Sequence, residues 1–214
     1  MEQREPIRGQ TPGSTIGGFP DWDLTPKQNC AVALKEWATI LEAMGKGEQL
    51  LLIRKGGLIE PGSGFEVVSP TFVFYPTFEH QAVNYLRDPF RRYFEDAAAR
   101  RAPQGQVRVE LVGQAVSSIQ SQDPSIVERL GPFHIYNEAF LTQRLKWQPD
   151  LPLVIVVVRA FRLTAPAMLP VAPHYAGCKS WVELDAPVSL EGAAPVVGDA
   201  AFQRALNELA PLLR

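Results

Sequence analysis

The chain has 214 residues, 46% of them hydrophobic, and a formal net charge of −2. This length and apolar content suffice for one domain with a sizeable core. The near-neutral net charge argues against nucleic-acid binding over most of the protein surface. Its two cysteines, Cys30 and Cys178, are too few for a disulfide framework and lack the paired spacing of a zinc site. We therefore expect neither a disulfide-stabilised fold nor a cofactor.

No apolar run approaches the roughly 20 residues that a membrane-spanning helix needs. The first residues, with Arg4 and Arg8 among glycines and prolines, lack the apolar centre of a signal peptide. We expect a cytoplasmic protein without a membrane partner.

Charge is unevenly distributed along the chain. Residues 50–179 contain 14 Lys and Arg against 11 Asp and Glu, while the rest contains 7 against 12. This distribution allows a basic face. The alternative is that the arginines near residues 91–101 are solvated helix charges paired with acidic neighbours at helical spacing. The arginines concerned are Arg91, Arg92, Arg100 and Arg101, and the acidic residues are Asp88, Glu95 and Asp96.

The first 24 residues are rich in Gly and Pro and predict a flexible tail, with residues 25–214 forming a single domain. Thr25-Pro26-Lys27-Gln28 has the pattern of a helix start, with a capping residue and a proline at the first helical position. We expect this helix to end at Gly45 or Gly47. Its buried stripe would be Ala33, Trp37, Ile40, Leu41 and Met44, with Lys35, Glu36 and Glu42 outside.

Short strands are expected at residues 49–54, 65–68 and 71–75, because these segments are rich in β-branched and aromatic residues between glycines and prolines. Their shortness favours an antiparallel meander. A helical segment is expected near residues 78–87. A second helix should begin at Asp88-Pro89 and end near Arg101.

Residues 106–119 alternate apolar and polar side chains and predict a long strand, with a bulge or bend at Gly113. Asp123-Pro124 should start a short helical turn, and Asn137 should cap a helix that carries Phe140, Leu141 and Leu145. Residues 153–158 are apolar at every position, which is typical of a central strand covered on both faces. We expect this strand to extend to residue 163.

Three prolines predict a loop over residues 164–177, followed by a strand at 180–184 and a helix capped by Asp199. The element order indicates an α+β fold with a mostly antiparallel sheet of five to seven strands or a small barrel, rather than a doubly wound parallel sheet.

Polar residues follow two of the expected strands at the point where each ends. Arg54 and Lys55 precede Gly56-Gly57, and Tyr75 is followed by Glu79 and His80. If the two strands lie close in the sheet, these side chains should meet, and Arg54 should come near His80. The alternative for the glycine pair is a tight turn.

Cations and aromatic side chains are interleaved in two later segments: Arg144, Lys146 and Trp147, and then Arg159, Phe161 and Arg162. This combination suits a groove that follows a nucleic-acid backbone and stacks on bases. The alternative for Trp147 is that it fills the edge of the core at a helix end.

Catalytic chemistry has weaker support. His80, His134 and His174 could form a three-histidine metal site with Glu79, but their spacing favours separate local hydrogen bonds. Cys178 stands beside Lys179 and could act as a nucleophile with His80 or His134 as base. A small buried residue entering a strand is the simpler interpretation of Cys178. A two-metal nuclease core is poorly supported, because Glu110 has no lysine after it in the strand.

Several motifs of the chain together resemble an uncharacterised bacterial family, domain of unknown function 1802. The likeness covers roughly residues 31–184 and rests on five segments: Ala33-Leu34-Lys35-Glu36-Trp37-Ala38, residues 47–57, Phe74-Tyr75-Pro76-Thr77-Phe78-Glu79-His80-Gln81, Arg144-Leu145-Lys146-Trp147-Gln148-Pro149 and residues 177–184. The resemblance implies no established activity. Some members of the family are associated with restriction-type nuclease domains, which implies a part in handling foreign or modified DNA.

The expected element order is also similar to the PUA-like barrels, including the ASCH domains that bind RNA or modified nucleotides. Gln49 stands where the ASCH motif has lysine, so no ligand position of that group is carried over.

The sequence thus predicts a non-enzymatic recognition domain for nucleic acid or a nucleotide. Its ligand site would consist of Arg54, Lys55, Tyr75, Glu79, His80, Arg144, Lys146 and Trp147. One alternative is a hydrolase of nucleotides or nucleic acid with Glu79 or His80 as base or metal ligand, and another is a protein-binding scaffold.

Overall fold

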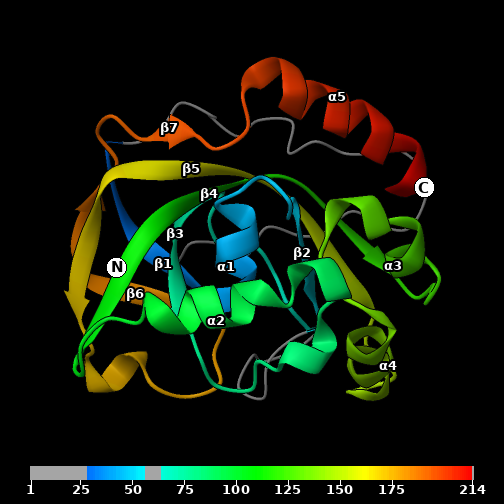
Figure 1. Ribbon diagram of the computed structural model, residues 1–214, viewed down its shortest axis with the longest axis horizontal. Helices are drawn as coiled ribbons and strands as arrows, with labels where there is room; N and C mark the ends of the chain where they lie inside the picture. The colour runs from blue at the N-terminus through cyan, green and yellow to red at the C-terminus, as the bar shows by residue number, and fades with distance from the viewer. Residues whose placement is uncertain (1–27, 56–63, 214) are drawn as a thin grey trace, which may run out of the picture.

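The computed structural model describes residues 28–55 and 64–213. The predicted tail, the predicted helix start at Thr25 and the Gly56-Gly57 turn lie outside these residues. The described chain forms a strongly curved, open sheet with helices packed against it, which is the α+β class predicted from the sequence (Figure 1).

Seven strands make up the sheet: β1 Asn29–Trp37, β2 Leu51–Arg54, β3 Thr71–Thr77, β4 Gln106–Ser121, β5 Leu153–Pro170, β6 Trp181–Ser189 and β7 Ala194–Pro195. Their order is β2-β5-β4-β3-β1-β6, with β7 paired to β5. The β1–β3 pair is parallel and the other pairs are antiparallel. The prediction of a mostly antiparallel sheet is therefore confirmed.

Five α-helices accompany the sheet in the described residues: α1 Ala38–Met44, α2 Arg92–Ala99, α3 Ile126–Arg129, α4 Glu138–Lys146 and α5 Asp199–Leu209. Single 3-10 turns lie at Val83–Tyr85, Asp88–Phe90, Gly131–Phe133, Pro173–Tyr175 and Ala210–Leu213. In Figure 1, α1 lies inside the curve of the sheet with α2 beside it, and α5 runs along β5. No helix of residues 28–55 or 64–213 is long and apolar enough to cross a membrane.

Two apolar clusters pack against the sheet, and on β3 they lie on opposite faces, because successive side chains of a strand point to opposite sides. On β3, Phe72 and Phe74 belong to the larger cluster, whereas Val73 and Tyr75 belong to the smaller one. The larger cluster, under α1, α4 and α5, also takes every residue of β5 from Leu153 to Val158. The prediction that this segment is a fully buried strand is confirmed.

The N-terminal prediction of one long helix is wrong for residues 29–37, which form β1. Its helical apolar spacing is real, but β1 pairs with β3 on one side and β6 on the other. Ala33 and Leu34, adjacent in sequence, are both buried because the two faces of the sheet are both covered. Pairing with distant strands therefore overrides the local helix signal.

The expected meander is also wrong. Residues 65–68 form no strand, and β2 pairs with β5 while β3 pairs with β1 and β4. Residues 164–170, predicted as loop, continue β5 to Pro170, and residues 167–170 pair with the start of β4. Proline is tolerated there because, among the described residues, no further strand pairs with that stretch on its other side.

Local sequence signals predict capping residues at the starts of α4 and α5. The Asn137 side chain accepts a hydrogen bond from the Phe140 backbone N–H at 3.2 Å, which is the cap predicted for α4. Asp199 was predicted to cap α5 but is its first helical residue, since Gly198 holds the cap position. The Asp199 carboxylate instead pairs with Arg159. The bulge predicted at Gly113 of β4 lies elsewhere: the register shifts fall between Val109 and Leu111 and between Ala115 and Ser117, while Gly113 pairs with Ala160. Glycine is needed at this position because an added Cβ would lie 2.4 Å from the Phe72 ring.

Candidate functional site

A cavity of about 1190 Å³ opens at the C-terminal ends of β1 and β3. The two strands are parallel, so their final residues and the segments that follow them meet at one edge of the sheet. Lys35, Glu36 and Trp37 of β1 line the cavity together with residues 74–80 of β3 and its continuation. The remaining walls come from α1 and the turn after it, from parts of residues 97–111, from Gln143, Arg144 and Trp147 of α4 and its end, and from residues 175–180. Arg54, Arg162 and Val171 complete the lining.

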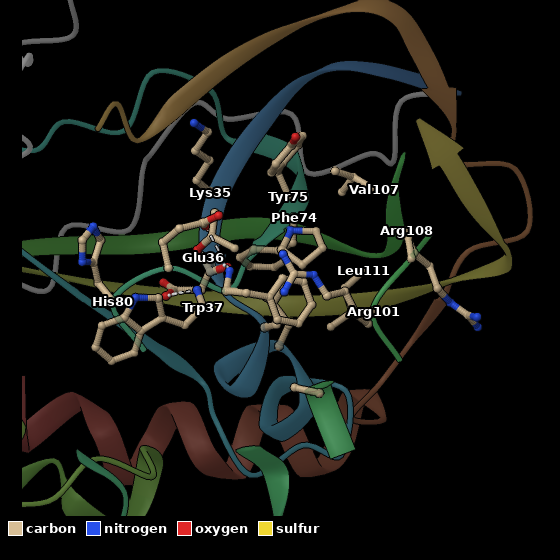
Figure 2. Close-up of a pocket in the computed structure, with 18 of the residues that line it drawn as sticks. Lys35, Glu36, Trp37, Phe74, Tyr75, His80, Arg101, Val107, Arg108 and Leu111 are labelled. Carbon is tan, nitrogen blue, oxygen red and sulfur yellow. Dashed lines mark hydrogen bonds between the residues drawn. The ribbon is translucent and has the colours of Figure 1, made fainter. Parts of the chain in front are cut away.

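The cavity reaches both faces of the sheet. Phe74 and Tyr75 both line it, although they belong to opposite apolar clusters. In Figure 2, Lys35 and Tyr75 project to one side of the strands, and Trp37 and Phe74 to the other. A ligand that fills the cavity therefore passes across the strand ends.

Basic side chains outnumber acidic ones in the lining. It contains nine lysines and arginines, Lys35, Lys46, Arg54, Arg100, Arg101, Arg108, Arg144, Arg162 and Lys179, against four glutamates, Glu36, Glu42, Glu79 and Glu110. The cavity therefore has a positive potential that favours anionic ligands.

Part of this charge is compensated at Glu110. Its carboxylate pairs with Arg100 and Arg108, each at 2.5 Å, and with Arg162 at 3.8 Å. Burial by itself would raise the pKa of Glu110, but the hydrogen bonds from Arg100 and Arg108 outweigh it and hold the pKa below its usual value. All three arginine side chains are about 40% exposed, so water screens what charge remains.

Arg54 and Arg144, which we call the arginine pair, lie in a more buried part of the lining. The Glu36 carboxylate, in a residue only 6% exposed, lies 3.2 Å from the Arg54 guanidinium and accepts a hydrogen bond from the Trp37 backbone N–H at 2.7 Å. Arg54 also donates to the Lys35 backbone carbonyl. Its buried Nε atom has no hydrogen-bond partner among the described residues.

Arg144 is a half-buried cation of the cavity with an unsatisfied guanidinium. This group lies 5.0 Å from the centre of the Phe140 ring and makes no hydrogen bond or ion pair within residues 28–55 and 64–213. Burial, and then the nearby charge of Arg54, lower its pKa. Arg144 is half-buried, and its Nε atom is fully buried without an acceptor, which is costly and makes the group available to an anionic ligand.

Lys35 and Lys179, which we call the lysine pair, lie on the other face of the sheet. The Lys35 ammonium donates to the backbone carbonyls of Tyr175 and Gly177, and the Lys179 ammonium donates to that of His174. Burial and then the charge of Lys179 lower the pKa of Lys35. Neither ammonium forms an ion pair of 4 Å or less in the described part of the chain.

Aromatic rings lie among these cations. Trp37, Phe74, Tyr75, Phe78, Trp147 and Tyr175 all line the cavity. Trp147 is 41% exposed, so its ring is not filling the edge of the core as the alternative interpretation supposed. The Arg101 guanidinium lies 4.7 Å from the centre of the Phe78 ring.

Six of the eight residues predicted for the ligand site line this one cavity: Arg54, Tyr75, Glu79, His80, Arg144 and Trp147. Lys55 and Lys146 do not. Lys55 is 3% exposed and donates to the Leu145 backbone carbonyl at 3.0 Å, away from the cavity. Lys146 lines a separate shallow depression on the outer side of α4.

His80 has a left-handed backbone conformation with φ of 62°, and so has Gln148, directly after Trp147, with φ of 44°. These are the non-glycine residues with positive φ in the described chain. This conformation is strained for both residue types, and such strain is often found at functional sites.

The three histidines do not converge. His134 is buried between the Val127 carbonyl and the Tyr136 backbone N–H, and His174 lies 3.1 Å from the Asp185 carboxylate. Residues 28–55 and 64–213 contain no group of three potential metal ligands. Cys178 is exposed in the cavity lining, so its interpretation as a buried strand residue is wrong. Arg159 pairs with Asp199 outside the cavity lining, whereas Arg162 is part of it.

Sequence reasoning missed Lys35, Glu36, Trp37 and Lys179 as cavity residues. The first three were placed on a helix, with Lys35 and Glu36 in solvent. The signal that points to them is the polar sequence Lys35-Glu36 before Trp37, which repeats the pattern of a strand ending in polar groups seen at Arg54 and Glu79.

Residues 33–208 match the family described as "Domain of unknown function (DUF1802)", and the chain belongs to this family. No curated protein matches the sequence. The fold is similar to crystal structures of ASCH from Zymomonas mobilis, in its parent form and in two single-residue mutants. These share 9% to 10% identity with the chain and cover 82% of it and 93% to 96% of their own chains, with TM-scores of 0.38 and 0.39. A likeness of this strength assigns no ligand and no site residue.

Proposed function

We propose that this domain is a recognition module that binds a nucleotide unit, free or within a nucleic acid, in the cavity at the ends of β1 and β3. The observation that carries the proposal is Arg144, a half-buried arginine in a basic, aromatic-walled cavity, whose guanidinium has no acceptor among the described residues and whose Nε atom is fully buried. A role in restriction-type DNA handling stays a prediction.

Phosphate is the anion that these cations fit best. A guanidinium presents two parallel N–H donors, which match two oxygens of a phosphate group. The Glu36 carboxylate forms an ion pair with Arg54 and acts on Arg144 only from a greater distance. One positive charge is therefore left over in a poorly hydrated place, where a phosphate oxygen would neutralise it.

The rings of the lining supply the second half of nucleotide recognition. Bases stack on aromatic side chains with about 1 to 3 kcal/mol per base, largely independently of base identity. Trp147 is the exposed candidate for such stacking, three residues along α4 from Arg144. At about 1190 Å³, the cavity exceeds the roughly 300–1,000 Å³ that small-molecule pockets occupy.

Titration of fluorescently labelled single-stranded DNA and RNA with the purified protein, together with calorimetry of nucleoside monophosphates, tests the proposal. At low salt we expect binding at tens of micromolar or tighter, weakening log-linearly with salt. Arg54→Ala should flatten the salt slope by up to about one unit. Trp147→Ala should weaken binding by about 1 to 3 kcal/mol and leave the slope unchanged.

Arg91→Ala is the matched control, because Arg91 is an exposed arginine paired with Asp88 outside the cavity lining. It should bind as the parent does. Absence of binding by every nucleotide and oligonucleotide at tens of micromolar would refute the proposal and leave the scaffold hypothesis. Gel analysis of the same mixtures covers the hydrolase alternative: cleavage that Glu79→Gln or His80→Ala abolishes would replace recognition with catalysis.

A further inference from the structure

Building on the proposed function, we infer that the ligand is a single-stranded segment of at least two successive nucleotides, with one phosphate on the arginine pair and another on the lysine pair. The inference concerns the length and strandedness of the ligand, which the proposed function leaves open.

Carboxylates compensate the charge of both pairs only in part. The arginine pair has Glu36, which contacts Arg54 alone, and the lysine pair is held by backbone carbonyls, with the charge of Glu79 acting on Lys35 from beyond ion-pair distance. In each pair the two cations also repel each other, since Lys179 lowers the pKa of Lys35 after burial does, and Arg54 acts likewise on Arg144. An anion bound at either pair would reduce the repulsion between the two cations and supply negative charge that the protein lacks there.

The two pairs lie on opposite faces of the sheet. The Lys35 ammonium is 5.9 Å from the centre of the Tyr75 ring and binds the Tyr175 carbonyl, and both tyrosines belong to the smaller apolar cluster. Arg144 stacks on Phe140, which belongs to the larger cluster. Figure 2 shows Lys35 on the opposite side of the strands from Trp37, which packs edge-on against Phe140 at 5.6 Å between ring centres.

A single phosphate cannot occupy both faces at once. A mononucleotide therefore satisfies one pair and leaves the other uncompensated. A strand with two or more phosphates can satisfy both pairs if its backbone crosses the ends of β1 and β3. The rings of the cavity lining, of which Trp147 is 41% exposed, provide apolar surface for the bases.

Single strands fit this path better than duplexes. Bases in a duplex are held inside the stack and reach a protein cavity only after costly extrusion. Bases of a single strand can be splayed apart and stacked on side chains. The cavity's walls of aromatic rings and cations suit such splayed bases.

The experiment measures affinity as a function of ligand length. Calorimetry would compare a nucleoside 5′-monophosphate, a 5′-phosphorylated dinucleotide, a trinucleotide and a pentanucleotide, each as DNA and as RNA, with a blunt duplex as a further arm. We expect at least a tenfold gain in affinity from mononucleotide to trinucleotide and a plateau beyond it. The duplex should bind more weakly than its single strands.

Salt titrations then assign the phosphates. Each phosphate contact on a single strand contributes about 0.7 to the slope of log affinity against log salt. For the trinucleotide, Arg144→Ala and Lys179→Ala should each lower the slope by about 0.7, and the double variant by about 1.4. Arg91→Ala should leave it unchanged. Circular dichroism and thermal melts would check that each variant folds.

The outcomes separate the inference from the function on which it rests. A mononucleotide that binds as tightly as the trinucleotide would overturn the inference and leave the proposed function intact, and so would a duplex that matches the single strands. If none of these ligands binds, the inference and the proposed function are both refuted. The length series uses the unaltered protein, so it decides the matter even where a variant fails to fold.

Discussion

Glu36 and Glu110 both line the cavity and both pair with arginine, yet their surroundings differ. Glu110 contacts three arginines whose side chains are about 40% exposed, and its own side chain is 18% exposed. Glu36 is 6% exposed and contacts Arg54 alone, with Arg144 nearby but beyond contact distance. Arginine outnumbers glutamate at both places, but water and ions screen the exposed surplus around Glu110 far better than the more buried one beside Glu36.

The contrast shows which of the cavity's charges matter for a ligand. Surplus charge at the Glu110 network is screened before a ligand arrives, so a ligand gains little there. Surplus charge at the arginine pair is poorly screened, because burial removes the competing water. If this distinction is correct, removing each glutamate's charge should have very different effects.

Glu36→Gln should give the largest change. Glutamine keeps the size of the side chain and an oxygen that accepts from the Trp37 N–H, but it leaves Arg54 and Arg144 without any carboxylate. Breaking a buried pair by neutralising one partner costs about 3 to 5 kcal/mol. We expect a loss of this order in the free energy of unfolding, measured by urea denaturation at pH 7. A loss below 1 kcal/mol would show that the arginine pair is well solvated and would remove the contrast.

His134 tests the cost of an uncompensated buried charge independently of the cavity. This imidazole is 2% exposed, and burial lowers its pKa to about 4. Because the unfolded chain binds this proton near pH 6.5 and the folded protein only near pH 4, protonation favours unfolding. The stability from His134 should be fully present above about pH 6.5 and fall by roughly 3 kcal/mol as the pH drops to 4.

Urea denaturation at several pH values would measure this fall for the parent and for His134→Gln. The glutamine variant should lose the part of the pH dependence between 6.5 and 4. The exposed His174, paired with Asp185, provides the control, because His174→Gln should leave that part in place. Equal pH dependence in the parent and His134→Gln would show that the buried imidazole is readily hydrated.

The separation along the chain between interacting residues explains which elements could be predicted from the sequence. The buried segment of β5 and the Asn137 cap were predictable because apolar residues at every position and a side-chain cap are local signals. β1 was not, because its helical spacing is local whereas its pairing with β3 and β6 joins segments about 40 and 150 residues away. That error removed Lys35 and Glu36 from the predicted site.

Within the predicted site, local geometry decided which cations reach the cavity. Arg54 and Lys55 are neighbours at the end of a strand, so their side chains point to opposite faces, and only Arg54 lines the cavity. Arg144, in the last turn of α4, and Trp147, directly after the helix, both line the cavity, whereas Lys146 does not. A cluster of charged residues in a sequence thus indicates where a site lies, and the direction in which each side chain points decides which of these residues line it.

Glu110→Gln should give the smallest change and completes the comparison. Its three arginines are partly exposed, so losing the carboxylate should cost about 1 kcal/mol or less at low salt. The hydrogen bonds from Arg100 and Arg108 hold the folded pKa of Glu110 below its unfolded value, so this stability is present above the unfolded pKa and is lost as pH falls through the folded one. Urea denaturation in about 1 M salt should abolish the difference from the parent, because the Debye length is then only about 3 Å. The Glu36→Gln difference should persist in the same salt, because the Glu36 residue is only 6% exposed and a buried pair is screened much less than an exposed one. If salt reduced both differences equally, the charges around the two glutamates would be equally screened. The arginine pair would then be no better suited to bind an anion than the arginines around Glu110.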